Sequence, residues 1–395
     1  MAAVLPLRGV IRPYAWGSRS AIAGLQGRPA PSDAPEAELW LGAHPGDPST
    51  VTGPDGPVSL AALIGDDPKG QLGAEVVDEF GPRLPYLMKV LAAEAPLSLQ
   101  AHPDAAYAKR AYAAQEADPA VPRNYTDEHH KPEMLVALTP FEALCGFRAP
   151  DVSAAVIEAL GLARLAPVVA ALRAGPAGLR DAVRVLLSWP ADDRAALIAD
   201  VVKAARGGGE YARSHTLAAD LAGRYPQDPG VLVALLLHQV SLAPGEAIWM
   251  PAGNLHAYLS GMGVEIMAAS DNVLRGGLTP KRVDVEELLR VLRFEVLDDP
   301  ILRATPVAPG VQTWPVPVRE FALYRVELTP AAPPLRLPGE GPRIVLGIRG
   351  DVFVAEAVDG TPVEVTPGTA AYVPAETGPA TLAGVGEVFV AAVAS

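Results

Sequence analysis

Two side chains that could bind a ligand, Gln100 and His102, stand two positions apart in the stretch APLSLQAHPD at residues 95–104. The stretch is built mainly from small and apolar residues, which favours a strand, and residues i and i+2 of a strand point to the same face. An amide oxygen and an imidazole nitrogen would therefore enter one space. A buried pair of this kind either forms internal hydrogen bonds or holds a ligand.

Three of the seven histidines lie in segments rich in other polar residues: His102, His130 in NYTDEHHKPEM, and His256 in PAGNLHAYLSG. Together the segments offer Gln100, His102, Glu133 and His256 as donors, which are two imidazoles, a carboxylate and an amide oxygen. That set suits Zn²⁺, although glutamine is an uncommon zinc ligand. Because Glu133 is the only anion, the ion would keep positive charge and act as a Lewis acid.

Spacing alone leaves an ordinary structural role open for each of these side chains. A structural or surface role is favoured for three other histidines: His44, His215 and His238.

A second polar cluster lies in SDNVLRGGLTPKR at residues 270–282. Asp271, Arg275 and Lys281 flank a Gly-Gly pair there, and cations on a glycine-bent loop suit an oxyanion or a phosphate. Lys131 adds another cation beside the predicted metal ligands. A solvated basic loop is the alternative that composition favours.

Composition limits the class of protein. The 395 residues are 50% hydrophobic and 19% charged, and 41 Pro and 37 Gly favour a turn-rich β architecture. The net charge of −13 argues against nucleic acid or an anionic membrane as a partner. A single cysteine, Cys145, excludes an internal disulfide, and no signal or membrane-spanning segment is recognisable, so we expect a cytoplasmic protein.

The pattern of apolar and polar residues divides the chain into regions. Short extended segments fill residues 1–149 and resume over 229–316, while apolar residues recur at i, i+3, i+4 and i+7 over 150–228 and predict four or five helices. Alternating apolar and polar residues dominate 317–395. We therefore expect a mainly β protein in which a helical domain (150–228) is inserted into one β domain (1–149 and 229–316), followed by a C-terminal β domain (317–395).

A short internal repeat points to two related β-barrels. PGEAIWMPA at 244–252 and PGTAAYVPA at 367–375 share five of nine positions. A turn, a buried strand and a Pro-Ala exit that occur twice are typical of jelly-roll barrels. Five residues past the exit proline stands His256 in the first copy and Pro379 in the second. Only the first barrel is therefore expected to carry a metal site.

Six motifs, in order along nearly the whole chain, belong together: YAWGS (14–18), AELWLGAHP (37–45), LPYLMKVLAAEAPLSLQAHPD (84–104), HHKPEM (129–134), FEALCGFR (141–148) and GEAIWMPAGNLHAYLSGMGVEIMAASDNVLRGGLTPK (245–281). In these motifs the chain resembles the type I mannose-6-phosphate isomerases of the cupin superfamily. The resemblance implies two cupin jelly-roll barrels with an inserted α-helical domain. It also implies an aldose–ketose isomerase with one Zn²⁺ per subunit that interconverts mannose 6-phosphate and fructose 6-phosphate.

The resemblance also assigns roles by motif. The implied zinc ligands are Gln100, His102, Glu133 and His256. The implied active-site arginine is Arg275. The residues expected near the substrate or its phosphate are Ser98, Lys131, Lys281 and Tyr258.

Isomerisation moves a proton between C2 and C1 through an enediol, so the site needs positive charge at the sugar oxygens and a base. The sequence offers three main candidates for the base, Asp271, Glu265 and His130, of which we favour Asp271 beside the Arg275 loop. Lys131 qualifies only if its pKa falls far below its free value.

Two other functions stay open at this point. One is a sugar-binding cupin without turnover, and the other is a different metal-dependent cupin enzyme, such as an oxygenase with a redox metal. We expect a small phosphorylated sugar as the ligand, no nucleic-acid or membrane partner, and a monomer.

Overall fold

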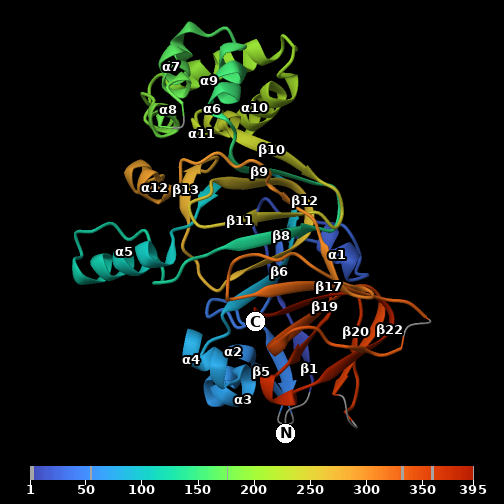
Figure 1. The fold of residues 1–395 in the computed structure, drawn as a ribbon. Coiled ribbons are helices and arrows are strands. Elements are labelled where there is room, and N and C mark those ends of the chain that lie inside the picture. The colour runs from blue at the N-terminus through green and yellow to red at the C-terminus, as the bar shows by residue number, and fades with distance from the viewer. Residues whose placement is uncertain (1–3, 54–55, 176, 331–332, 357–359, 395) are drawn as a thin grey trace.

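The computed structural model describes residues 4–53, 56–175, 177–330, 333–356 and 360–394. They form two antiparallel sheets with a group of helices at one end (Figure 1). We call the sheets sheet 1 and sheet 2.

Sheet 1 has eleven strands, and seven of them follow one path: β14 (Ile301–Leu302), β11 (Ala247–Met250), β8 (Glu133–Ala137), β12 (His256–Ala268), β6 (Tyr86–Ala93), β3 (Glu38–Leu41) and β2 (Val10–Arg12). Four more pair beside this path: β7 (Leu99–Ala101), β9 (Phe141–Phe147), β10 (Leu237–Leu242) and β13 (Leu274–Gly277).

Sheet 2 also has eleven strands, in the order β15 (Thr305–Ala308), β16 (Val311–Thr313), β17 (Ala322–Leu328), β22 (Ala380–Val393), β19 (Glu340–Glu356), β21 (Ala370–Val373), β1 (Leu5–Arg8), β4 (Thr50–Gly53) and β5 (Gly56–Ser59). Two short strands pair beside this path: β18 (Leu335–Arg336) and β20 (Val363–Val365). The protein is thus mainly β, as predicted.

Six α-helices and two 3-10 turns connect β9 to β10: α6 (Pro150–Glu158), η1 (Ala163–Leu165), α7 (Ala166–Arg173), α8 (Gly178–Leu187), α9 (Arg194–Ala205), α10 (Ala212–Arg224), α11 (Gly230–Val233) and η2 (Ala234–Leu236). Five of them lie within 150–228, as the periodicity predicts. Leu179, Val183 and Leu186 of α8 are buried because their three- and four-residue spacing places them on one face.

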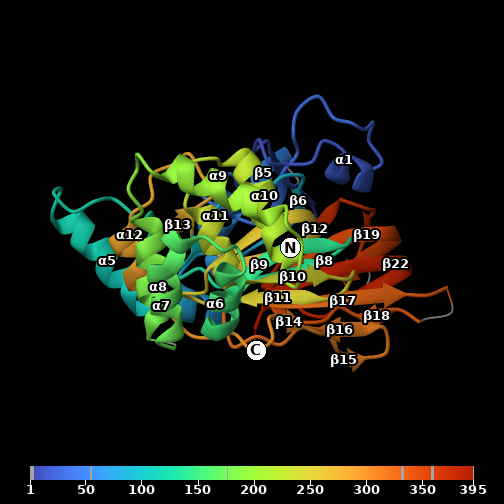
Figure 2. The same ribbon diagram turned by 90° about the horizontal axis from the view of Figure 1, so that it is seen from above.

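The other helices are α1 (Ala21–Leu25), α2 (Leu60–Asp66), α3 (Pro68–Leu72), α4 (Ala74–Phe80), α5 (Ala105–Ala117), α12 (Val285–Val291) and the 3-10 turn η3 (Ala375–Thr377). Seen from above, α5, α8 and α12 lie on the opposite side of the molecule from β19 and β22 (Figure 2), and α12 contacts α8. Among the described residues, none of the helices combines the length and the apolar character needed to cross a bilayer.

The two repeat segments form corresponding strands in the two sheets. PGEAIWMPA contains β11, which precedes the long strand β12, and PGTAAYVPA contains β21, which precedes the long strand β22. The prediction of a buried strand at both places is confirmed.

The sheets do not follow the predicted division of the chain. Strands β1, β4 and β5 near the N-terminus belong to sheet 2, where Leu5 pairs with Tyr372, and sheet 2 resumes at Thr305 rather than at 317. Alternation of apolar and polar residues shows which face of a strand is buried but does not identify its neighbour. The predicted boundaries therefore missed these exchanges.

One hydrophobic core joins the two sheets. Tyr86 and Met88 of β6 lie in the same buried cluster as Leu346 of β19 and Phe389 of β22. The Tyr86 hydroxyl donates to the carbonyl oxygens of Pro342 (3.0 Å) and Ala391 (3.2 Å). Burying each large apolar side chain contributes about 1.5–3 kcal/mol, so packing against sheet 2 stabilises β6.

Candidate metal centre

Three buried side chains meet within sheet 1. Nε2 of His102 lies 3.3 Å from Oε2 of Glu133, and Nε2 of His256 lies 3.2 Å from the same oxygen. One ligand atom from each residue lies within 4.8 Å of the others, so a single metal ion could contact all three. The prediction that these distant segments converge is confirmed.

Strand pairing brings the three together. His256 is the first residue of β12 and pairs with Gln100 of β7, while Glu133 is the first residue of β8, which pairs with β12 farther along. The turn before β12 requires Gly253, whose φ is +79° and whose N–H donates to the carbonyl oxygen of His102 at 2.8 Å. This bond ties the two histidine segments to each other.

Backbone carbonyls select the tautomer of both histidines. Nδ1 of His102 lies 2.7 Å from the carbonyl oxygen of Asn272, and Nδ1 of His256 lies 3.1 Å from that of Asn254. Each Nδ1 therefore carries the proton, and each Nε2, close to Glu133, keeps a lone pair that a metal ion could accept. Nε2 of His102 is buried without a hydrogen-bond partner, as expected for an atom that binds a metal. The donor set fits Zn²⁺.

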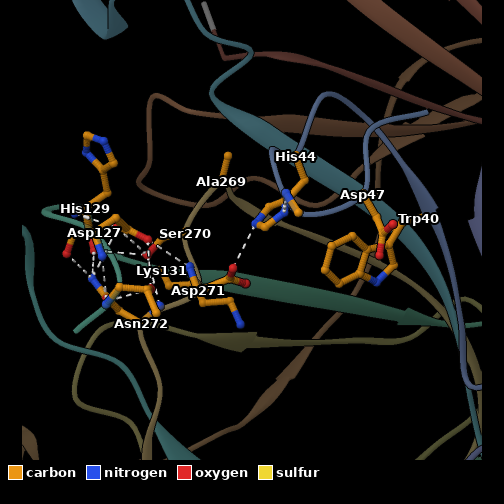
Figure 3. A network of polar contacts seen from close by, with 12 residues as sticks. Trp40, His44, Asp47, Asp127, His129, Lys131, Ala269, Ser270, Asp271 and Asn272 are labelled. Carbon is orange, nitrogen blue, oxygen red and sulfur yellow. Dashed lines mark hydrogen bonds and ion pairs between the residues drawn. The ribbon is translucent and has the colours of Figure 1, made fainter. Parts of the chain in front are cut away.

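The carbonyl that orients His102 is itself held by a polar network (Figure 3). Nδ2 of the fully buried Asn272 donates to the carbonyl oxygens of Asp127 and His129, both at 2.8 Å. The Asp127 carboxylate accepts from the Ser270 hydroxyl at 2.8 Å. Such outer hydrogen bonds fix the direction of a ligand and are part of a metal site.

The protonation states suit metal binding. Burial lowers the pKa of His102, although the charge of Glu133 opposes this, so the imidazole is neutral. Burial alone would raise the pKa of Glu133, but the charge of Lys131 outweighs it and holds that pKa well below its usual range. Nζ of Lys131 lies 2.9 Å from Oε1 of Glu133. The carboxylate is therefore ionised.

A small cavity of about 50 Å³ opens beside this cluster. The predicted site residues among its lining are Ser98, Gln100, Lys131, Glu133, His256, Tyr258 and Glu265. Seven of the twelve predicted site residues thus line one cavity, and His102 lies 3.3 Å from Glu133 at its edge.

Sequence reasoning missed two cavity residues, Lys89 and Glu38. Nζ of Lys89 lies 3.5 Å from Glu38 and 3.4 Å from Glu265, and all three side chains are buried. Burial would lower the pKa of Lys89, but the two carboxylates raise it, so the ammonium stays charged. The available signal was one lysine in the apolar run YLMKVLAA, because a buried charge needs partners.

Tyr258, predicted to bind substrate, donates its hydroxyl to Oε1 of Glu265 at 2.7 Å. Burial raises the pKa of Glu265 despite the opposing charge of Lys89. This carboxyl therefore holds a proton at a higher pH than a free glutamate does.

Arg275 and Lys281 lie on the segment that follows the centre. Arg275 of β13 pairs with Gln100 of β7, which places it next to a predicted ligand, and its pKa is lowered by burial. Lys281 instead lines a separate cavity of about 600 Å³ between β13 and the helices. The structure thus does not bring Lys281 to the small cavity that Ser98 and Lys131 line.

Asp271 and His130 lie outside the small cavity. Oδ2 of Asp271 is 3.3 Å from Nε2 of His44, and both line a neighbouring cavity of about 390 Å³ (Figure 3). The hydrogen bond from His44 lowers the pKa of Asp271. Nε2 of His130 lies 2.5 Å from Oε1 of Glu320. His44, for which the sequence favours a structural or surface role, is thus the hydrogen-bond partner of Asp271.

This geometry defines the class of protein: a two-sheet β protein with a buried His/Glu metal centre and a charged cavity beside it. The family model described as "Phosphomannose isomerase type I, catalytic domain" matches residues 4–150.

Two relatives illustrate the likeness over the full length. The mannose-6-phosphate isomerase of Escherichia coli (strain K12) is 35% identical over 386 residues, which cover 95% of this chain and 96% of the relative. That of Rattus norvegicus is 32% identical and covers 82% of both chains. The chain therefore belongs to the family of type I phosphomannose isomerases.

Solved structures agree with this assignment. A zinc-bound mannose 6-phosphate isomerase superimposes with a TM-score of 0.89 at 31% identity over 100% of both chains. A single-residue variant of the Salmonella typhimurium phosphomannose isomerase gives a TM-score of 0.89 at 32% identity, again over 100% of both chains.

Proposed function

We propose that this chain is a zinc-dependent aldose–ketose isomerase that interconverts mannose 6-phosphate and fructose 6-phosphate. The observation that carries the proposal is the pair of imidazole Nε2 atoms, 3.3 Å and 3.2 Å from one buried carboxylate oxygen. It occurs in a chain that is similar over nearly its whole length to mannose-6-phosphate isomerases. One Zn²⁺ would be held by Gln100, His102, Glu133 and His256.

Bound there, the ion would supply Lewis-acid chemistry at the sugar oxygens. The chain's own residues do the rest. Arg275, beside Gln100, stabilises negative charge on O1 and O2 in the enediolate. Lys281, Ser98 and Lys131 are the residues that would hold the phosphate. Lys281 would approach it from a different cavity than Ser98 and Lys131, and this remote binding would orient the reacting carbons.

Geometry now favours Glu265 as the base that moves the proton between C1 and C2. Glu265 lines the same cavity as the ligands, and its raised pKa brings it nearer to neutrality, where a general base works best. Asp271 lines the neighbouring cavity and has a lowered pKa, which makes it a weaker base. The assignment of the base to Asp271 stays a prediction, and comparing Glu265→Gln with Asp271→Asn distinguishes the two candidates.

Metal content and mannose 6-phosphate turnover, before and after chelation, test the function. We expect about one zinc per chain, loss of turnover with the metal, and recovery on adding Zn²⁺. Glu133→Gln should lose both metal and turnover, because one carboxylate contacts both imidazoles, while His238→Gln, outside the cluster, should keep both. A metal-free wild type with full turnover would refute the proposal, and bound zinc without turnover would indicate a sugar-binding protein.

We further propose that sheets 1 and 2 form two cupin jelly-roll barrels and that α6–α10 are an inserted domain. The long strands β12 and β22, each preceded by a copy of the same short segment, support this. We also propose a cytoplasmic monomer, which light scattering and cell fractionation can check.

A further inference from the structure

The segment after Arg275 packs against the end of the helical region with backbone on backbone. A Cβ atom added at Gly277 would lie 2.6 Å from Cα of Gly230, and one added at Gly230 would lie 2.8 Å from Cα of Gly277. Gly277 also has a φ of +120°. Only glycine at both positions allows this close approach. The backbone at Gly277 therefore packs directly against the backbone at Gly230, in the segment that follows α10.

The Asp228 carboxylate joins the two backbones. One oxygen accepts the N–H of Gly230 at 2.8 Å, and the other accepts the N–H of Thr279 at 3.0 Å. Between the glycine contact and this bond lies Leu278, a buried non-glycine residue with a φ of +55°. Such a conformation persists only where the surroundings hold it.

The residues on both sides of this contact are those that the proposed reaction needs. Upstream, Arg275 is fixed opposite Gln100 by the β13–β7 pairing. Downstream, the Lys281 N–H donates to the Thr279 hydroxyl oxygen at 3.1 Å, so Lys281 follows the position of Thr279. Asp228, Thr279 and Lys281 line the same cavity of about 600 Å³. A shift of Thr279 would therefore move Lys281 relative to Arg275.

We propose that Asp228 is a positioning residue of the isomerase: it fixes the Gly277–Thr279 turn so that Lys281 grips the substrate phosphate while Arg275 faces the reacting carbons. The inference rests on the function proposed above. It also gives the helical region a part in substrate binding, since the carboxylate comes from the segment that follows α10.

Asp228→Asn tests the proposal. The amide has nearly the same shape as the carboxylate, but it presents an NH₂ group to one of the two backbone N–H groups. A displacement of about 1 Å in an active site can lower the reaction rate up to about 100-fold. We expect the KM for mannose 6-phosphate to rise about tenfold and inorganic phosphate to bind about tenfold more weakly by calorimetry. Zinc content should equal that of the wild type, because no metal ligand is touched.

Asp67→Asn is the matched control. Asp67 also accepts a backbone N–H, that of Gly70 at 3.0 Å, but this bond is exposed and caps helix α3, away from the site. It should change neither the KM nor phosphate binding.

An unchanged KM and unchanged phosphate affinity in Asp228→Asn, with only a lower Tm, would assign Asp228 a structural role and overturn the inference. Loss of zinc would overturn it as well. Should Asp228→Asn not fold, Asp228→Ser, which keeps one short acceptor, is held to the same measurements. Phosphate calorimetry needs no turnover, so a wild type without isomerase activity would refute the function while the role of Asp228 is still tested.

Discussion

At the scale of single residues, two carboxylates with opposite pKa shifts compete for the role of base. Burial raises the pKa of Glu265 above its ordinary 4.5, whereas the hydrogen bond from His44 lowers that of Asp271 below its ordinary 3.8. A base acts only when ionised, so activity is lost as the pH falls through its pKa. With Glu265 as the base, the acidic limb of kcat/KM lies above pH 4.5. With Asp271 it lies below pH 3.8.

Glu265→Gln should therefore lower kcat by about 10²–10⁴-fold, whereas Asp271→Asn should change it by less than about tenfold. A full pH profile of both variants and the wild type checks this. The opposite ranking of the two variants would restore the assignment to Asp271 that the sequence favoured.

Some residues of the candidate site could be predicted from the sequence and others could not. The two-residue period of a strand predicts that Gln100 and His102 point one way. The structure places Gln100 at the small cavity and His102 beside Glu133. Lys89 was not predictable, because its function depends on Glu38 and Glu265 from two other strands. A sequence shows that a charge lies in an apolar run but not which partners compensate for it.

At the scale of elements, His130 and Glu320 connect the two sheets. Nε2 of His130, in the segment before β8, lies 2.5 Å from Oε1 of Glu320, in the segment before β17. Burial would raise the pKa of Glu320, but the hydrogen bond with His130 outweighs it and the pKa is lowered. A carboxylate with a lowered folded-state pKa adds stability above its ordinary value of 4.5, and this stability is lost as the pH falls through the folded-state pKa.

Glu320→Gln should lower the free energy of unfolding by about 1–2 kcal/mol at pH 7, and the difference from the wild type should shrink below pH 4.5. Denaturant unfolding at both pH values measures this. Glu79→Gln is the control, because Glu79 pairs with Arg319, the residue before Glu320. This ion pair is exposed and should contribute less than about 0.5 kcal/mol to the free energy of unfolding. Equal losses in the two variants at pH 7 would contradict the argument.

The positions of helices and strands along the chain were easier to predict than the pairing of strands within a sheet. The i, i+3, i+4 pattern gave the five helices within 150–228, and the repeat gave β11 and β21, because both signals are local. The pairing of β1 with β21 joins residues more than 350 positions apart, and its register depends on the shared core rather than on either strand alone.

At the scale of the whole molecule, the metal centre joins parts of the chain that only folding brings together. The cluster of His102, Glu133 and His256 joins the residue just after β7, the start of β8 and the start of β12. An unfolded chain therefore lacks this cluster, and zinc binds the folded state alone. Binding energy at this centre is thus also stabilisation of sheet 1 and, through the shared core, of sheet 2.

Removal of zinc by a chelator should therefore lower the Tm of the entire protein. A free zinc concentration about 1,000 times the Kd adds about 4 kcal/mol, which for a chain of this length corresponds to about 5 °C. Scanning calorimetry with and without added Zn²⁺ measures the shift. His256→Ala, which lacks one ligand, should melt at nearly the same temperature in both conditions. A zinc-independent Tm in the wild type would mean that the cluster does not bind the ion in the folded state.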